Sequence, residues 1–208
     1  MLNKQGFNLW ASDYDQTVQI SEENQQYPFA GYKEIMNLIF NEVMQKKHSR
    51  VLDIGFGTGV LASKLYENGH RIDGVDFSSQ MIEIAQSKMP NANLIEWDIS
   101  NGLPDAIIKN QYDFIVSTYA LHHLEDQDKA VLIEKLLLLL TEQGKIIIGD
   151  IAFQKQEDLQ SCRTKSIDFW DEDEFYFVFQ DIKELLKTVC NCEFHQVSHC
   201  GGILVLTK

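Results

Sequence analysis

The chain has 208 residues, of which 44% are apolar, and its formal net charge at pH 7 is -13. This length and composition predict one globular domain with one sizeable core. A charge of this sign, with no local cluster of lysine and arginine, disfavours nucleic acid as a partner. No segment reaches the roughly 18 uninterrupted apolar residues of a membrane span, and the N-terminus lacks the apolar core of a signal peptide. We therefore expect no membrane partner and a cytoplasmic location.

The first elements alternate along the chain. Apolar residues recur at helical spacing in residues 28–47, which end in lysines, as suits a helix C-terminus. From residue 50 onward we expect strands at 50–55, 71–76, 92–98, 112–120 and 145–151, separated by helices at 59–69, 78–89 and 125–144. Ser78 or Ser79 is the expected N-cap of the second of these helices. Alternation of this kind predicts a doubly wound α/β domain, with parallel strands and helices on both faces of the sheet.

The C-terminal part departs from this alternation. After a helix expected at 181–191, two short apolar runs at 193–199 and 202–208 are joined by too few residues for a crossover helix. They should pair as an antiparallel hairpin at an edge of the sheet.

Three alternate glycines follow the first expected strand, in the stretch VLDIGFGTG at residues 51–59. In a doubly wound sheet, ligands bind beyond the carboxyl ends of the strands, and the first strand-to-helix turn usually contacts them. Glycine at this turn permits positive φ and lets backbone amides approach a ligand. The alternative is a tight turn that packs the helix closely against the strand.

The residues around this turn indicate a ligand that contains a ribose. The third glycine comes one residue too early for a dinucleotide fingerprint, and Val60 occupies the later position. Asp76 ends the second expected strand, where a carboxylate can accept both ribose hydroxyls, although it could instead cap the next helix. Trp97 and Asp98 end the third strand, and an aromatic plane beside a carboxylate suits a purine with an exocyclic amine. Taken alone, Trp97 is equally compatible with simple packing.

Several of these stretches together resemble a known family. VLDIGFGTG, GVDFS, WDIS, YDFIVSTYALHHL and LLLLLTEQGKIIIGD are similar to the motif series of class I S-adenosylmethionine-dependent methyltransferases, especially small bacterial stand-alone domains. The N-terminal WASDYDQTVQ is similar to an opening segment found among them. The resemblance covers essentially the whole chain. It implies a Rossmann-like, mostly parallel seven-stranded sheet with an antiparallel C-terminal strand, and in-line methyl transfer from S-adenosylmethionine to a small-molecule acceptor.

The resemblance also implies roles for individual residues. The glycines would pass under the methionyl and ribose part of the cofactor, Asp53 would lie near its ammonium group, Asp76 would hold the ribose hydroxyls and Asp98 the adenine amine. The whole set expected to bind the cofactor is Tyr14, Asp53, Gly55, Gly57, Gly59, Asp76, Phe77, Met81, Trp97, Asp98, Ile99 and Ser117. Phe77, Met81, Trp97 and Ile99 would form the adenine slot. Tyr14 could instead line the acceptor pocket or belong to a surface helix.

A catalytic side chain is optional, because the cofactor carries the reactivity and the protein mainly orients and desolvates the reactants. If the acceptor must lose a proton, His122 or His123 after the fourth strand is the candidate base. The same pair could equally cap a loop. Two alternatives stay open: a non-catalytic module that binds adenosylmethionine, and an NAD(P)-dependent oxidoreductase.

No metal site is expected from the cysteines and histidines near the C-terminus. Their spacing fits no usual zinc motif, and strand alternation places His195 and His199 on one face and Cys200 on the other. The expected organisation is a helical lid and cover (1–47, with 7–19 as a mobile lid), a cofactor-binding core (48–152), an acceptor-side insert (153–180) and a C-terminal helix with hairpin (181–208). We expect a monomer or homodimer.

Overall fold

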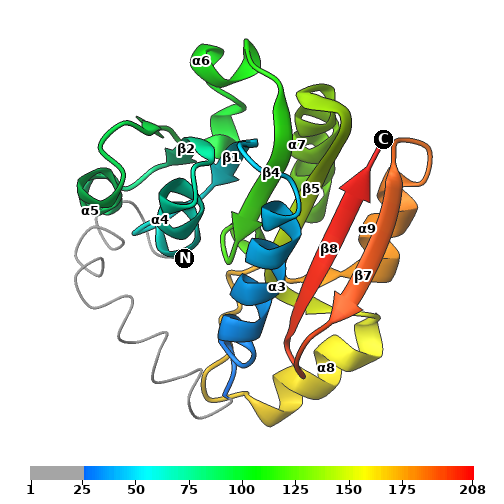
Figure 1. The fold of residues 1–208 in the computed structure, drawn as a ribbon. Coiled ribbons are helices and arrows are strands. Elements are labelled where there is room, and N and C mark those ends of the chain that lie inside the picture. Colours follow the sequence, from blue (N-terminus) through cyan, green and yellow to red (C-terminus); the bar gives the residue numbers. More distant parts are fainter. Residues whose placement is uncertain (1–25) are drawn as a thin grey trace.

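The computed structural model describes residues 26–208, in which helices cover both faces of a single sheet (Figure 1). The expectations for Tyr14 and for a lid at residues 7–19 fall on positions outside the described residues. None of the helices in the described part has the length and apolar character needed to cross a membrane.

The sheet is doubly wound, as predicted, and its strand order is β3-β2-β1-β4-β5-β8-β7. Its strands are β1 (Arg50–Ile54), β2 (Arg71–Asp76), β3 (Asn93–Glu96), β4 (Tyr112–Thr118), β5 (Leu140–Phe153), β7 (Asn191–Gln196) and β8 (Gly201–Thr207). The strands from β3 to β5 are parallel, whereas β8 runs antiparallel to both β5 and β7. This confirms the expected hairpin, with β7 at the edge. A two-residue strand that the pattern did not predict, β6 (Phe177–Val178), pairs with β5 beside this path.

Helices lie on both faces of the sheet, and each face has its own core. The elements are α3 (Tyr32–Met44), α4 (Val60–Glu67), α5 (Ser79–Lys88), α6 (Asp105–Ile108), α7 (Asp126–Leu138), α8 (Gln156–Lys165), α9 (Phe179–Leu186) and the 3-10 turns η1 (Ile99–Asn101) and η2 (Leu121–His123). Val51 belongs to the core beneath α3, α4 and α5, and its neighbour Leu52 belongs to the core beneath α6, α7 and α9. Alternate side chains of one strand therefore fill opposite layers, as expected for a central parallel strand.

The boundary between α7 and β5 differs from the expected one. The helix predicted to continue to residue 144 ends at Leu138, and the strand already begins at Leu140, opposite Tyr112. Five consecutive leucines (136–140) conceal this boundary, because an uninterrupted apolar run suits either a buried helix or a buried strand. Pairing with β4 marks the start of the strand at Leu140, whereas Leu138, the last residue of the helix, is 75% exposed.

Smaller differences occur at two other helices. The first helix begins at Tyr32 rather than at residue 28, because Gly31 has a left-handed conformation (φ 81°) that ends the preceding turn. The last helix ends at Leu186 rather than at residue 191, since Asn191 already pairs with β8. The expected cap of α5 is confirmed for Ser78, whose hydroxyl oxygen accepts a hydrogen bond from the Met81 N–H at 3.3 Å.

Candidate functional site

The glycine turn between β1 and α4 forms one wall of a cavity of about 650 Å³ at the carboxyl edge of the sheet. Gly55, Gly57 and Gly59 have φ values of 70°, 55° and 78°, which confirms the expected left-handed backbone. A Cβ added to Gly57 would meet no atom within 4 Å, and Gly57 lines the cavity. A Cβ on Gly59 would instead lie 3.1 Å from Met89 Cε and 3.2 Å from Ala85 Cβ. Close approach of a ligand therefore explains the glycine at position 57, and close packing against α5 explains the glycine at position 59.

Asp76 lies at the end of β2 and lines the same cavity. Its Oδ2 accepts a hydrogen bond from the Gly57 N–H at 2.8 Å, and its Oδ1 accepts one from the Ser78 N–H at 2.9 Å. Burial raises the pKa of Asp76, and these N–H groups oppose that rise. Because each carboxylate oxygen can accept a further bond, Asp76 can bind ribose hydroxyls while it holds the glycine turn. The helix cap itself is Ser78, so Asp76 is not needed for capping.

Asp53 on β1 is a buried carboxyl that does not itself line the cavity. Among the described residues its Oδ1 has no hydrogen-bond partner. Burial raises the pKa of Asp53 to about 8, and the nearby Asp76 carboxylate adds to the rise. A buried carboxyl with an unsatisfied oxygen is costly to keep, and an ammonium group nearby would remove this cost.

The residues expected around the adenine come together on one side of the cavity. The lining includes Phe77, Met81, Trp97, Asp98 and Ile99. The Trp97 indole N–H donates to the Gly102 carbonyl at 2.9 Å, which fixes its ring. Asp98 is exposed and caps η1, because its Oδ1 accepts the Ser100 N–H at 2.9 Å. Its other oxygen remains available in this geometry for an amine donor.

Several lining residues were not predicted. Tyr32 and Met36 reach the cavity from α3, and Thr118, Tyr119 and Ala120 reach it from the end of β4. Thr118, Tyr119 and Ala120 could have been predicted from their position at the end of the fourth strand, because ligands bind at the carboxyl ends of such strands. Tyr32 and Met36 could not have been predicted in this way. A helix that covers the sheet is expected to be apolar on its inner face, so its periodicity does not distinguish a lining residue from a core residue.

Ser117, like Asp53 and Gly59, is an expected cofactor residue that does not line the cavity. It is buried within β4, and its hydroxyl donates to the Ile54 carbonyl of β1 at 2.8 Å. It is not among the residues that line the cavity. Strand alternation explains this placement, because Ser117 and the lining residue Thr118 point to opposite faces of the sheet.

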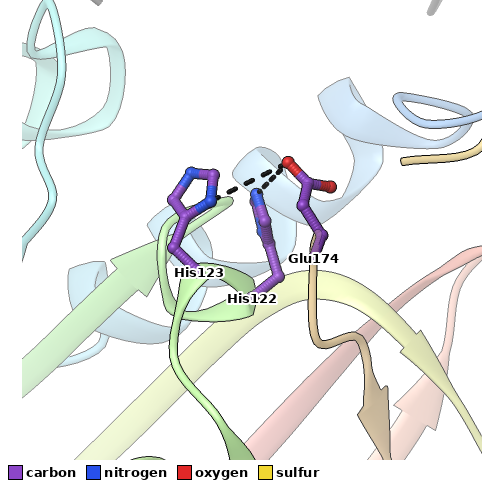
Figure 2. A group of neighbouring side chains, drawn as sticks. All are labelled: His122, His123 and Glu174. Atoms are coloured by element: carbon purple, nitrogen blue, oxygen red, sulfur yellow. Dashed lines mark ion pairs between the residues drawn. The ribbon is translucent and has the colours of Figure 1, made fainter. Parts of the chain in front are cut away.

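The two candidate histidines lie in η2, just after β4, and Glu174 approaches both of them (Figure 2). His122 Nδ1 lies 2.6 Å from Asp150 Oδ1, and its Nε2 lies 3.5 Å from Glu174 Oε1. His123 Nδ1 lies 3.8 Å from the same oxygen, and His123 also lines the cavity. His123 therefore borders the cavity, His122 is buried behind it, and Glu174 comes from the insert after β5.

The protonation of the two imidazoles differs because their neighbours differ. Burial alone would lower the pKa of His122, but the carboxylates of Asp150 and Glu174 outweigh this effect and raise it. Burial, together with the neighbouring His122, lowers the pKa of His123 to about 3. In neutral solution His123 is therefore an uncharged imidazole.

Comparison with known proteins agrees with this geometry. Residues 51–144 match the family described as "Methyltransferase domain". An uncharacterized methyltransferase of Anoxybacillus flavithermus is 37% identical over 151 residues, which are 73% of this chain and 68% of that protein. One of Alkaliphilus oremlandii is 30% identical over 177 residues, covering 85% and 78% respectively. The structure of magnesium protoporphyrin IX methyltransferase from Synechocystis PCC 6803 with bound S-adenosylhomocysteine superposes with a TM-score of 0.70 at 18% identity, over 99% and 98% of the two chains.

Fold and cavity together define a Rossmann-like protein in which a glycine turn, the carboxylate of Asp76 and a group of apolar side chains line one cavity at the carboxyl edge of the sheet. The sequence relatives narrow this class: the chain belongs to the class I S-adenosylmethionine-dependent methyltransferases. Its cofactor is S-adenosylmethionine, which decides against the oxidoreductase, and membership of a methyltransferase family decides against the non-catalytic module. The open space at Gly57 and the unsatisfied oxygen of Asp53 both fit this cofactor.

Proposed function

We propose that this methyltransferase acts on a small-molecule acceptor by in-line displacement. The observation that carries the proposal is the continuity of the cavity. One space of about 650 Å³ connects the glycine turn and Asp76 with Tyr119 and His123 after β4. This volume is within the usual range for sites that take small ligands, roughly 300–1,000 Å³.

The lining divides the cavity into two ends. We assign the cofactor to the end formed by β1, β2 and β3, where Gly57, Asp76 and Trp97 lie. The acceptor would occupy the other end, beside Tyr119 and His123. Residues 153–180 would cover this acceptor end, because Glu174 of this segment already contacts the histidine pair.

Two features support a small acceptor rather than a nucleic acid. The net charge of -13 opposes binding to phosphate backbones. The Synechocystis enzyme of the same fold is named for a small-molecule acceptor, magnesium protoporphyrin IX. This neighbour supports a small molecule, rather than a macromolecule, as the kind of acceptor proposed for this chain.

The bound cofactor supplies a methyl group on a sulfonium, and the chain supplies position and exclusion of water. Asp76 and the glycine turn would hold the ribose, and the tilted rings of Tyr32 and Tyr119, with centroids 5.3 Å apart, would form an apolar wall. His123, being neutral, offers a lone pair at the acceptor end of the cavity.

The test has two stages. Calorimetry with S-adenosylhomocysteine first measures binding by the full chain. A screen with methyl-labelled S-adenosylmethionine then follows transfer to pools of small metabolites, with protein and RNA pools as controls. We expect label in a small-molecule pool, and Asp76→Ala should slow its appearance at low cofactor concentration. Label that enters only protein or RNA would overturn the proposal.

A further inference from the structure

We propose that His122, His123 and Glu174 bind a divalent transition-metal ion at the acceptor end of the cavity. Among residues 26–208 these three form the group whose nitrogen and carboxylate oxygen atoms all lie within 4.8 Å of one another (Figure 2). The site goes beyond the proposed methyl transfer, which requires no metal.

The spacing of the three side chains suits one ion. Two ligand atoms, each about 2.1 Å from a shared metal, lie about 3.0–3.4 Å apart in octahedral or tetrahedral geometry. Glu174 Oε1 lies 3.5 Å from His122 Nε2 and 3.8 Å from His123 Nδ1. Both distances exceed those of ordinary hydrogen bonds, and each would shorten by a few tenths of an ångström on binding an ion, while all three ligand atoms already lie within 4.8 Å of one another.

His122 is already oriented as a metal ligand. Its Nδ1 lies 2.6 Å from the buried Asp150 carboxylate, which also accepts the backbone N–H groups of Leu121 and Ile151. With the Nδ1–H donated to Asp150, Nε2 is the nitrogen that faces Glu174, and an ion bound there would replace any proton on it. A carboxylate that holds the far nitrogen of a ligating imidazole is the usual outer partner of histidine metal sites.

Glu174 is held in place by its neighbour in sequence. The Phe175 N–H donates to the His122 carbonyl at 2.7 Å, and the buried Lys129 ammonium donates to the Phe175 carbonyl. Lys129 is itself paired with Asp126 at 2.8 Å. The backbone of the insert is therefore fastened to η2 and α7, which brings the carboxylate to the histidines in advance of any ligand.

Two imidazoles and one carboxylate are a donor set for zinc and for related ions such as cobalt, and three protein ligands leave at least one position open. His123 lines the cavity, so this position borders the acceptor end. An oxygen or sulfur anion of the acceptor would suit it. This last step rests on the proposed function, whereas binding of the ion itself does not.

The experiment measures metal binding by the full chain without cofactor or acceptor. After treatment with a chelator, the protein is titrated with Zn²⁺ by calorimetry and with Co²⁺ by visible absorption. We expect one metal ion to bind per chain, and we expect a Co²⁺ spectrum typical of nitrogen and oxygen ligands. His123→Ala and Glu174→Gln should each weaken binding by at least tenfold, and Asp150→Asn by roughly 10–100-fold.

Matched controls separate this site from adventitious binding. Glu172→Gln changes an exposed carboxylate two residues from Glu174, and His195→Ala removes a histidine of β7; neither should alter the affinity. If His122→Ala fails to fold, His123→Ala and Glu174→Gln still decide the question. Absence of one-equivalent binding, or binding that survives both of these variants, would overturn the proposal and leave methyl transfer untouched.

Discussion

At the residue scale, Asp76 connects the backbone of the glycine turn with the cavity, through its bonds to Gly57 and Ser78. If it also holds the ribose, Asp76→Ala should weaken binding of S-adenosylhomocysteine by about 1–3 kcal/mol, or roughly 5–150-fold, because charge-assisted hydrogen bonds are lost. Calorimetry measures the change. Asp105→Ala, on the exposed start of α6, is the control. An unchanged dissociation constant in a folded Asp76→Ala protein would remove Asp76 from the site.

Asp53 makes a prediction about pH. Its pKa of about 8 in the folded protein lies above the unfolded value near 3.9, so the folded state keeps a proton that the unfolded chain releases. The contribution of Asp53 to the free energy of unfolding is therefore fully present below about pH 4 and is lost as pH rises through about 8. Asp53→Asn should remove this loss. Denaturant unfolding of both proteins at several pH values checks it, and parallel pH curves would contradict it.

The same carboxyl predicts coupling between cofactor binding and proton release. An ammonium group near Asp53 favours its charged form, so binding of S-adenosylhomocysteine at pH 7 should release a proton. The affinity should rise with pH and level off above about pH 8. Calorimetry in two buffers of different ionisation enthalpy measures the released protons. The prediction fails if Asp53→Asn releases as many protons as the wild type.

At the element scale, Gly59 permits the close packing of α4 against α5. Gly59→Ala places a methyl group 3.1 Å from Met89 Cε in a left-handed residue and should lower stability by more than the roughly 1–2 kcal/mol of the backbone alone. Gly69→Ala is the matched control, since its φ of 83° is similar and its nearest contact, 3.5 Å to His48, is ordinary. Thermal unfolding compares the two. Equal losses would show that the contact between α4 and α5 tolerates the methyl group.

Element boundaries show where local pattern is insufficient. The run of leucines at 136–140 is apolar throughout, so neither helical nor strand periodicity can be read in it. The strand begins at Leu140 because that residue pairs with Tyr112 on β4, a contact between residues far apart in sequence. By contrast, the glycine turn and the cap at Ser78 depend on nearby residues, and both were predicted correctly.

At the scale of the whole molecule, the cofactor should stabilise the fold selectively. S-adenosylhomocysteine at a hundredfold excess over its dissociation constant should add about 2.7 kcal/mol, which corresponds to a rise in Tm of roughly 5–11 °C. NAD should leave the Tm unchanged, because the third glycine stands one residue early for a pyrophosphate turn. Thermal shift with both ligands tests this. A rise with NAD and none with S-adenosylhomocysteine would contradict the assignment of the cavity.

Sequence by itself determined the doubly wound fold and the hairpin at the sheet edge. Each of these follows from short-range features: periodicity, turn residues and the rule that consecutive parallel strands bring their carboxyl ends to one edge. Of the residues expected to bind the cofactor, Gly55, Gly57, Asp76 and the four of the adenine slot line the cavity, whereas Asp53, Gly59 and Ser117 do not.

Only the tertiary structure decided the histidine cluster. Glu174 is separated from His122 by a helix, a long strand and most of the insert, and nothing in its own stretch marks it as a neighbour of a histidine. The contact exists because a backbone bond to His122 and the buried Lys129 fasten the insert to the rest of the domain. Long-range contacts of this kind depend on how the elements pack together, and that packing cannot be predicted from a local sequence pattern.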